Sequence, residues 1–232
     1  MILTVIQPSY FPNISALSRM ARADVVVWAD SFRYSKHSTI NRARIKTVSG
    51  AAWLTVPILT TGRISQPIQK VIFDKEHFWR QTHLRSLEVS YQNSPYYSFF
   101  SDDIENILNE NYVFLNDILL ASTRFLLRKL RTPVKLLRSV DLPKVEDRSR
   151  RVVRWMQECK CDEYLVESAD MNYIDAEIVG HIGKLIEFEF CPKKYYQLFQ
   201  SYIENLSGLD LLFNEGEMSK LILAESAKLK RT

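Results

Sequence analysis

The chain has 232 residues, of which 46% are hydrophobic and 12% aromatic, which is enough for one large core or two small ones. No stretch approaches the roughly 18 apolar residues of a transmembrane helix, and the first residues lack the basic region of a signal peptide, so we expect a cytoplasmic protein without a membrane span. The net charge of +4 equals the excess of the segment 30–46 alone, and such a local patch favours a small anionic ligand over a nucleic acid.

The first third of the chain predicts strands joined by one short helix and one basic loop. The runs at 2–6 and 23–30 are continuously apolar rather than alternating, which is typical of strands covered on both faces. Asn13 or Ser15 is placed to cap a short helix between these two strands. The run at 51–59 predicts a third strand, and the polar segment before it, 31–50, predicts a loop.

The middle and the end of the chain predict helices alternating with strands. A helix capped by Asp74 is expected first, and it opens a helical insertion or subdomain at 74–131. Further helices are expected at 94–112, 113–131, 147–160, around 173–182 and at 216–232, and further strands at 134–142, 163–168 and 184–190. This alternation predicts an α/β fold with a mainly parallel, Rossmann-like sheet flanked by helices. We expect one domain over 1–232.

Two of the predicted strands end in polar residues that could meet a ligand. The first is followed by Gln7, Pro8, Ser9 and Tyr10, and the second ends at Asp30. Ligands of open parallel sheets lie at the carboxyl ends of the strands, so these residues are candidates for a binding site. The alternative, with about equal weight, is a stiff turn between two prolines in which Tyr10 plugs the core.

The basic segment has a period of two. Arg42, Arg44 and Lys46 alternate with apolar residues, so an extended backbone would carry them on one face. Such a face suits phosphate or carboxylate, because arginine binds both through two parallel hydrogen bonds. The residues alone favour the alternative of an edge strand protected by its charge.

One histidine and one aspartate are the candidates for acid–base chemistry. His83 shares a helical face with Trp79 and Leu87 and is either a core residue or, if it lines a cleft, the best general base. Asp210 lies inside the apolar run 209–213, where a carboxylate either caps a helix or is held for function. The three cysteines, two of them in a C-x-C pair, predict no metal site.

Seven stretches of the chain, in this order, resemble the WbqC-like family. They are "IQPSYFP", "ARADVVVWAD", "YSKHSTINRARIKT", "WLTVPI", "WRQTHLRSLEVSYQNSPYY", "EYL" and "YYQLFQSYIENLSGLDLLFNEG". The family consists of bacterial proteins encoded among genes for O-antigen, and thus lipopolysaccharide, and for other surface polysaccharides. Any one stretch would be a weak signal, whereas their order over nearly the whole chain is specific.

The resemblance implies a role in polysaccharide biosynthesis and a set of motif positions. Those positions are Gln7, Pro8, Tyr10, Asp30, Tyr34, Lys36, Asn41, Arg42, Arg44, Lys46, His83 and Asp210. The chain departs from the family pattern before "YSK", before "NR" and after "YL". The departing residues are Ser31, Arg33, Thr39, Ile40, Val166, Glu167 and Ser168.

Three functions are compatible with these residues. The first is a transferase that moves an acyl or aminoacyl group to the amine of an activated amino sugar. In it His83, oriented by Asp210, acts as general base, and Gln7 stabilises an oxyanion. The anionic substrate, a nucleotide sugar or a phosphopantetheine-linked donor, would be bound by Ser9, Tyr10, Asp30, Tyr34, Lys36, Asn41, Arg42, Arg44 and Lys46. The donor itself stays open between acyl-CoA and a carrier-protein thioester.

The second function is that of a nucleotidylyltransferase-like or ATP-dependent enzyme, which stands behind the first because the chain lacks an H-x-G-H signature. The third is a non-catalytic binding protein in a glycan-assembly complex. Against it, charged and polar residues occupy the motif positions, where an interface would favour exposed apolar and aromatic patches. The oligomeric state is not predicted.

Overall fold

A computed structural model describes residues 1–36, 38–59, 65–74 and 78–231. Its largest element is a six-stranded sheet in the order β5-β2-β1-β6-β7-β8, in which all neighbours are parallel except β7 and β8. The strands are β1 (Ile2–Ile6), β2 (Val25–Trp28), β5 (Lys135–Arg138), β6 (Glu163–Glu167), β7 (Lys184–Phe190) and β8 (Ala227–Arg231). The predicted α/β class with a mainly parallel sheet is therefore confirmed.

The direction of chain winding reverses next to β1. From β1 the chain runs outward through β2 to β5, and then returns to place β6 on the other side of β1. Leu3 of β1 thus pairs with Val25 on one side and with Tyr164 on the other. A reversal of this kind leaves a crevice outside the carboxyl ends of β1 and β6, and ligands of open α/β sheets bind in such crevices.

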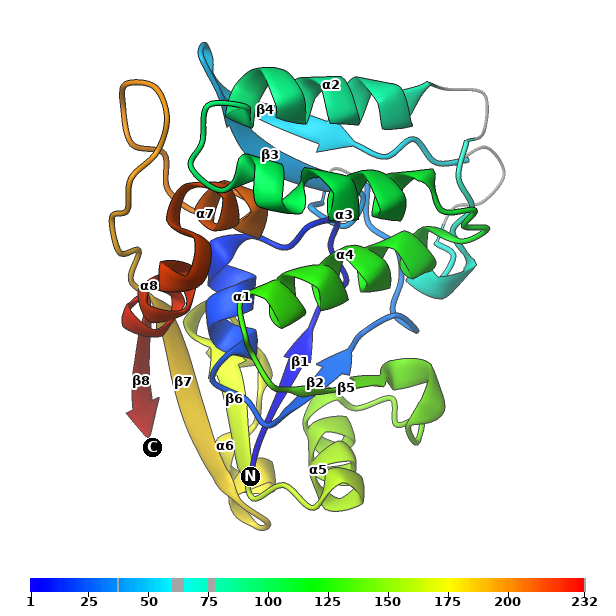
Figure 1. Ribbon diagram of the computed structural model, residues 1–232. Coiled ribbons are helices and arrows are strands. Elements are labelled where there is room, and N and C mark those ends of the chain that lie inside the picture. The colour runs from blue at the N-terminus through cyan, green and yellow to red at the C-terminus, as the bar shows by residue number, and fades with distance from the viewer. Residues whose placement is uncertain (37, 60–64, 75–77, 232) are drawn as a thin grey trace.

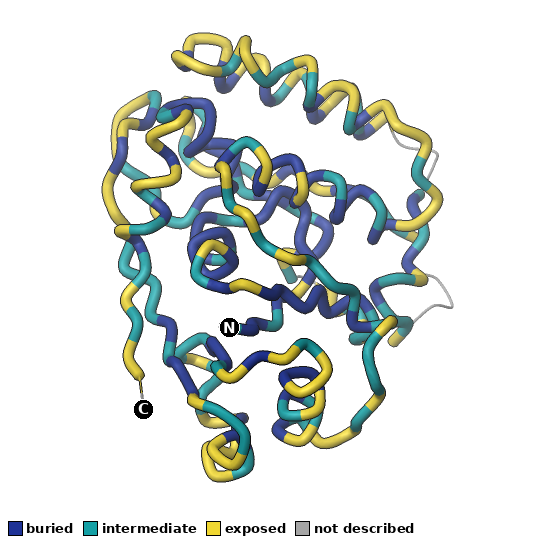
Figure 2. The backbone as a smooth tube through the Cα atoms, turned by 60° about the horizontal axis from the view of Figure 1, so that its bottom comes forward, coloured by how far each residue is buried: buried dark blue, intermediate teal, exposed yellow. Residues whose placement is uncertain are grey.

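Helices cover both faces of the sheet (Figure 1). Helices α5 (Arg148–Cys159) and α6 (Ala176–Gly180) lie on one face, where Val25 and Val27 share an apolar core with Trp155. The other face carries α1 (Ile14–Met20), and there Val26 and Trp28 belong to the largest core. Burial on both sides explains why β1 and β2 are continuously apolar. In Figure 2 the buried backbone concentrates accordingly in the sheet and in the helix faces turned toward it.

A two-stranded antiparallel sheet lies beyond the ends toward which β1 and β2 point (Figure 1). It consists of β3 (Arg42–Thr47) and β4 (Gly50–Thr55), paired from Arg42↔Thr55 to Thr47↔Gly50. The prediction of a loop at 31–50 was therefore wrong in part, and the strand expected at 51–59 does not join the parallel sheet. The alternation of polar and apolar residues in β3 fits a half-buried hairpin better than a central strand.

Five further helices contribute to the largest core, which also includes residues of the hairpin and of one face of the sheet. They are α2 (Trp79–Tyr91), α3 (Tyr97–Asn109), α4 (Leu115–Lys129), α7 (Gly208–Glu215) and α8 (Ser219–Glu225). The N-cap of α2 is Phe78, so Asp74 does not cap it as predicted, and residues 75–77 lie outside the described part of the chain. In the described part of the chain there are also 3₁₀ turns at Ile68–Lys70, Ser139–Asp141, Ser168–Tyr173 and Gly216–Met218.

The helix predicted for 216–232 is wrong beyond residue 225. The chain leaves α8 and forms β8, antiparallel to β7. Lys230 of β8 forms ion pairs with two carboxylates of β7, at 3.2 Å from Glu189 and 3.9 Å from Glu187. Pairing across strands thus overrode a helical pattern of only two turns, which is marginal without tertiary packing.

Candidate functional site

The turn after β1 is held in place by two distant segments. The backbone N–H of Tyr10 donates to the carbonyl of Ile40 (2.9 Å), and the hydroxyl of Ser207 donates to the carbonyl of Phe11 (2.9 Å). Phe11 has a φ of 38°, which is uncommon for a residue other than glycine and is maintained only when the surroundings fix it. The turn is thus a rigid part of the fold.

Some side chains of this turn line cavities at the protein surface, and others are buried in the core. Gln7 is exposed, and its amide forms no hydrogen bond with the described part of the chain. Ser9 is nearly buried but lines two cavities. Tyr10 and Phe11 are each 1% exposed, and their rings pack edge to face with centroids 4.7 Å apart. Gln7 and Ser9 can therefore meet a ligand, whereas Tyr10 acts mainly as a core residue.

Three adjoining cavities form one groove along the carboxyl edge of the sheet. The largest, of about 420 Å³, lies between β1, β6 and α5, and it shares Gln7, Arg19 and Glu167 with a middle cavity of about 170 Å³. The middle cavity shares Ser9 and Asn13, among other residues, with a third cavity of about 190 Å³ at the hairpin. We call these the α5 cavity, the neck and the hairpin cavity. The groove therefore crosses the point at which the winding of the sheet reverses.

The α5 cavity contains an arginine cluster that the sequence interpretation missed. Arg19 lies 3.3 Å from Glu167, and Arg148 lies 3.3 Å from Asp170. The guanidinium of Arg151 stacks over the ring of Phe32, with 4.8 Å between its central carbon and the ring centroid. The basic character of 147–160 was visible in the sequence, but its direction toward a cavity was not.

The hairpin cavity contains part of the predicted basic stripe. Arg42 and Arg44 line it, and the Arg42 guanidinium lies 4.6 Å from the ring centroid of Trp53. Arg44 donates to the carbonyl of Glu204 (2.7 Å). These two arginines match the prediction of an anion-binding face, while ligand binding by them stays a prediction.

Lys46, the third member of the stripe, is directed into the protein. It is 1% exposed, and its ammonium donates to the carbonyl of Ser201 (2.7 Å) and to the side-chain oxygen of Gln197 (3.2 Å). Burial lowers the pKa of Lys46, and the negative charge of Asp210 raises it in part. Lys46 therefore holds the segment 197–201 against the hairpin instead of lining the groove.

Three further candidates lie outside the groove lining. Tyr34 donates to the side-chain oxygen of Asn41 (2.9 Å), and the Asn41 amide donates to the carbonyl of Val56 (2.8 Å). Lys36 is exposed and is not among the groove residues. Tyr34 and Asn41 thus fix the entry of the chain into β3, a structural role that fits their contacts better than substrate binding.

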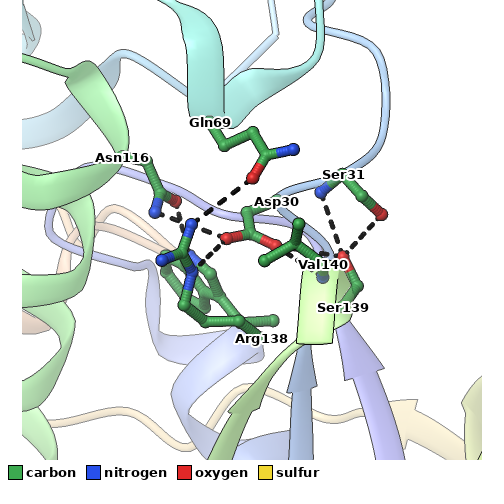
Figure 3. A network of polar contacts seen from close by, with 8 residues as sticks. Asp30, Ser31, Gln69, Asn116, Arg138, Ser139 and Val140 are labelled. Carbon is green, nitrogen blue, oxygen red and sulfur yellow. Dashed lines mark hydrogen bonds and ion pairs between the residues drawn. The ribbon is translucent and has the colours of Figure 1, made fainter. Parts of the chain in front are cut away.

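Asp30 is enclosed by a polar network at the end of β2 (Figure 3). It is fully buried, and its carboxylate accepts hydrogen bonds from Arg138 Nε (2.5 Å), Ser139 Oγ (3.1 Å) and the N–H of Val140 (3.3 Å). Asn116 contributes a longer contact of 3.5 Å. The carboxylate therefore ties β2 to the end of β5, and the contacts leave no side of it facing the groove.

His83 is a buried, hydrogen-bonded histidine. It is 3% exposed, its Nδ1 lies 3.1 Å from the Tyr10 hydroxyl, and it also forms a hydrogen bond to the backbone of Thr55. Burial lowers its pKa to about 4, so the ring is neutral at pH 7. It lines an apolar depression of about 370 Å³ together with Trp53 and Trp79, and this depression shares Trp53 with the hairpin cavity.

Asp210 does not orient His83, contrary to the expected dyad. Its carboxylate accepts hydrogen bonds from the hydroxyls of Tyr91 (2.8 Å) and Tyr195 (2.6 Å) and is fully buried. Burial raises the pKa of Asp210 to about 6, against the opposing effect of these two hydrogen bonds and of Lys46. From the sequence, a helix-capping role was one alternative for Asp210. The N-cap of α7 is instead Ser207, whose hydroxyl accepts a hydrogen bond from the N–H of Leu209.

Glu167 is the carboxylate that the structure adds to the site. It ends β6, lines both the α5 cavity and the neck, and is partly exposed. In the sequence it appeared only as a departure from the family pattern. Within the described residues, no cluster of three or more His, Cys, Asp or Glu side chains is arranged to hold a metal ion, and no helix has the length and apolarity to cross a membrane.

The fold and the groove define an α/β protein with a polar, arginine-lined groove at the carboxyl edge of its sheet. The chain belongs to the WbqC-like protein family, whose model matches residues 7–221. It is 26% identical over 217 residues to the protein named "Uncharacterized protein Rv1507c" of Mycobacterium tuberculosis, covering 92% of this chain and 94% of that protein. No solved structure matches the chain.

Proposed function

We propose that the protein is a transferase of surface-polysaccharide or glycoconjugate biosynthesis. It would move an acyl or aminoacyl group from a thioester to the amine of a nucleotide-activated amino sugar. The observation that carries the proposal is a continuous groove with arginines at both ends and a neck between them that holds the single carboxylate Glu167. Both substrates of such a reaction are anionic, and the two arginine-lined ends offer each of them a binding site.

The neck contains the groups that such a transfer needs. The amine nitrogen attacks the thioester carbonyl, the C–S bond breaks, and the proton released from the nitrogen passes through Glu167 to the leaving thiolate. Gln7, whose amide has no partner in the described structure, is placed to donate to the developing oxyanion. Glu167 takes the role of base in place of His83 because Glu167 lines the neck beside Gln7, whereas His83 is hydrogen-bonded to Tyr10 and Thr55 and lines the depression beside Trp79.

Turnover by the purified protein tests this proposal. Nucleotide-activated amino sugars are incubated pairwise with acyl-CoA thioesters, and the N-acylated product and free thiol are measured by mass spectrometry and thiol titration. We expect one pair to react, and Glu167→Gln to lower kcat by about 10²- to 10⁴-fold, as loss of a general base does.

The matched control is Glu163→Gln on the same strand. Glu163 lies at the other end of β6, pairs with Arg231 at 3.4 Å and does not line the groove, so its loss should leave kcat unchanged. Unchanged turnover in Glu167→Gln would remove the proposed base. Binding of both substrates without any product would remove the proposed reaction.

A further inference from the structure

The α5 cavity differs from the rest of the groove in size and in its walls. Its volume of about 420 Å³ is in the range of pockets that bind small organic molecules, and far exceeds what a single inorganic anion fills. The apolar and aromatic part of its lining, called the apolar wall below, comes from β1, β6, α5 and the segment after β2 and consists of Val5, Phe32, Val152, Trp155, Tyr164 and Val166. The lining also carries a net positive charge, because the three arginines Arg19, Arg148 and Arg151 outnumber the carboxylates Glu167 and Asp170.

The positive charge of this cavity is not fully neutralised by the protein. Glu167 and Asp170 pair with Arg19 and Arg148, but among the described residues no carboxylate forms an ion pair with Arg151. The Arg151 guanidinium donates only to the carbonyls of Val145 (3.1 Å) and Glu146 (3.2 Å). Burial and the charge of Arg148 lower the pKa of Arg151, against smaller opposing effects of Tyr164 and Asp147.

Phe32 and Trp155, the aromatic rings beside Arg151, are held by contacts within the protein. The rings of Phe32 and Trp155 stack with centroids 6.3 Å apart and planes 21° apart, and the Trp155 Nε1 donates to the carbonyl of Pro143 (2.9 Å). Arg151 lies against both rings, at 4.8 Å from Phe32 and 5.7 Å from Trp155. The guanidinium is thereby held in one orientation, so little conformational freedom is lost on binding.

We infer that the α5 cavity binds a nucleoside diphosphate. The base and ribose lie along the apolar wall, and the phosphates lie against Arg148 and Arg151 in the crevice between β1 and β6. A bare phosphate or diphosphate would leave the apolar wall uncovered, and a purely apolar ligand would leave Arg151 without a counter-charge. The inference deepens the proposed function, on which it rests for the source of the ligand, by naming the substrate group held at this end of the groove.

Two molecules of the proposed reaction carry this group. A nucleotide-activated sugar contains a nucleoside diphosphate, and so does coenzyme A in its adenosine portion. In either case the rest of the molecule would extend past Gln7 into the neck. The two sources share the recognition chemistry and differ in which ligand competes best.

Isothermal titration calorimetry of the full chain with UDP, coenzyme A and inorganic pyrophosphate tests the inference. We expect UDP or coenzyme A to bind at least about 10-fold more tightly than pyrophosphate, because only they cover the apolar wall. Tighter binding of UDP assigns the cavity to the sugar nucleotide, and tighter binding of coenzyme A assigns it to the acyl donor. Equal affinity for all three ligands, or no binding, would overturn the inference.

Three substitutions at two neighbouring arginines locate the site. Arg151→Met removes the unpaired charge and should weaken the nucleotide by about 10- to 100-fold, whereas Arg151→Lys should weaken it less. Arg150→Met is the matched control, since Arg150 is exposed on the same helix and does not line the cavity. Circular dichroism checks that each variant is folded, and an Arg151→Met variant that is folded and binds like wild type would overturn the inference.

The binding assay needs neither a second substrate nor turnover. If the transfer reaction is absent, nucleotide affinity and its loss in Arg151→Met still decide whether the cavity binds a nucleoside diphosphate. Conversely, turnover that is insensitive to Arg151→Met would keep the proposed function and place the nucleotide elsewhere.

Discussion

Replacing Asp30 by alanine should lower the free energy of unfolding by about 2–4 kcal/mol, because it removes a fully buried carboxylate and leaves the buried donors around it without an acceptor. Arg138 loses a contact of 2.5 Å, and the hydroxyl of Ser139 and the N–H of Val140 lose theirs (Figure 3). Denaturation in urea, followed by circular dichroism, measures the change. The midpoint should fall with little change in the denaturant slope.

Two further variants separate a structural Asp30 from a substrate ligand. Asp102→Ala, on the exposed side of α3, removes a carboxylate without a buried network and should stay within about 0.5 kcal/mol of wild type. Asp30→Asn keeps the shape and should cost less than Asp30→Ala. An Asp30→Asn variant with wild-type stability but lost substrate binding would contradict the structural role and restore the prediction made from the sequence.

The stability of the wild-type protein should fall on acidification in a way that His83→Gln removes. The folded protein holds the His83 pKa at about 4, whereas the unfolded chain takes up this proton near pH 6.5. A lowered pKa contributes stability that is present above pH 6.5 and is lost as the pH falls toward 4. Between pH 7 and pH 4, wild type should therefore lose about 3 kcal/mol more than the variant.

Asp210 should act in the opposite direction over nearly the same range. Its pKa of about 6 in the folded protein exceeds the ordinary value of 3.8, so it binds its proton before the unfolded chain does. Its contribution is greatest below pH 3.8 and is lost as the pH rises through 6. Asp210→Asn should thus make acidification between pH 7 and pH 4 more destabilising than in wild type, by about 2 kcal/mol.

Urea denaturation at several pH values, with both single variants and the double variant, measures these effects. The pH slope is the readout, so a constant loss of stability from imperfect packing of glutamine or asparagine does not obscure it. Parallel pH profiles for wild type and His83→Gln would contradict the buried, neutral histidine and would make His83 available again as a base.

The central strands could be predicted from the sequence because burial on both faces leaves continuous apolar runs. The hairpin could not be separated from the main sheet in the same way, since β4 is also rich in apolar residues and only its partner decides where it pairs. The strand β8 was missed because its cross-strand partners, Glu187 and Glu189, lie some forty residues earlier in the chain.

The site residues divide for a similar physical reason. Gln7, Ser9, Arg42 and Arg44 line the groove, and their common location could be predicted because they follow a strand or alternate along one. Lys46 follows the same alternation, but the segment 197–201 covers it. This contact is distant in the sequence, so the local pattern could not predict it. Arg148 and Arg151 have the spacing of a solvated helix face, and only the position of α5 against the sheet turns them inward.

The neck of the groove joins two segments that are nearly two hundred residues apart. Asn13 forms a bridge with Ser207, and Asn205 accepts a hydrogen bond from the backbone N–H of Ser15 (2.9 Å). During synthesis, residues 205–207, which complete the neck, are therefore added only after almost all other elements. Contacts of such long sequence separation form late, because closing the intervening chain costs entropy that only the assembled core offsets. A nascent chain that stops before residue 205 contains all the parallel strands but lacks one wall of the neck.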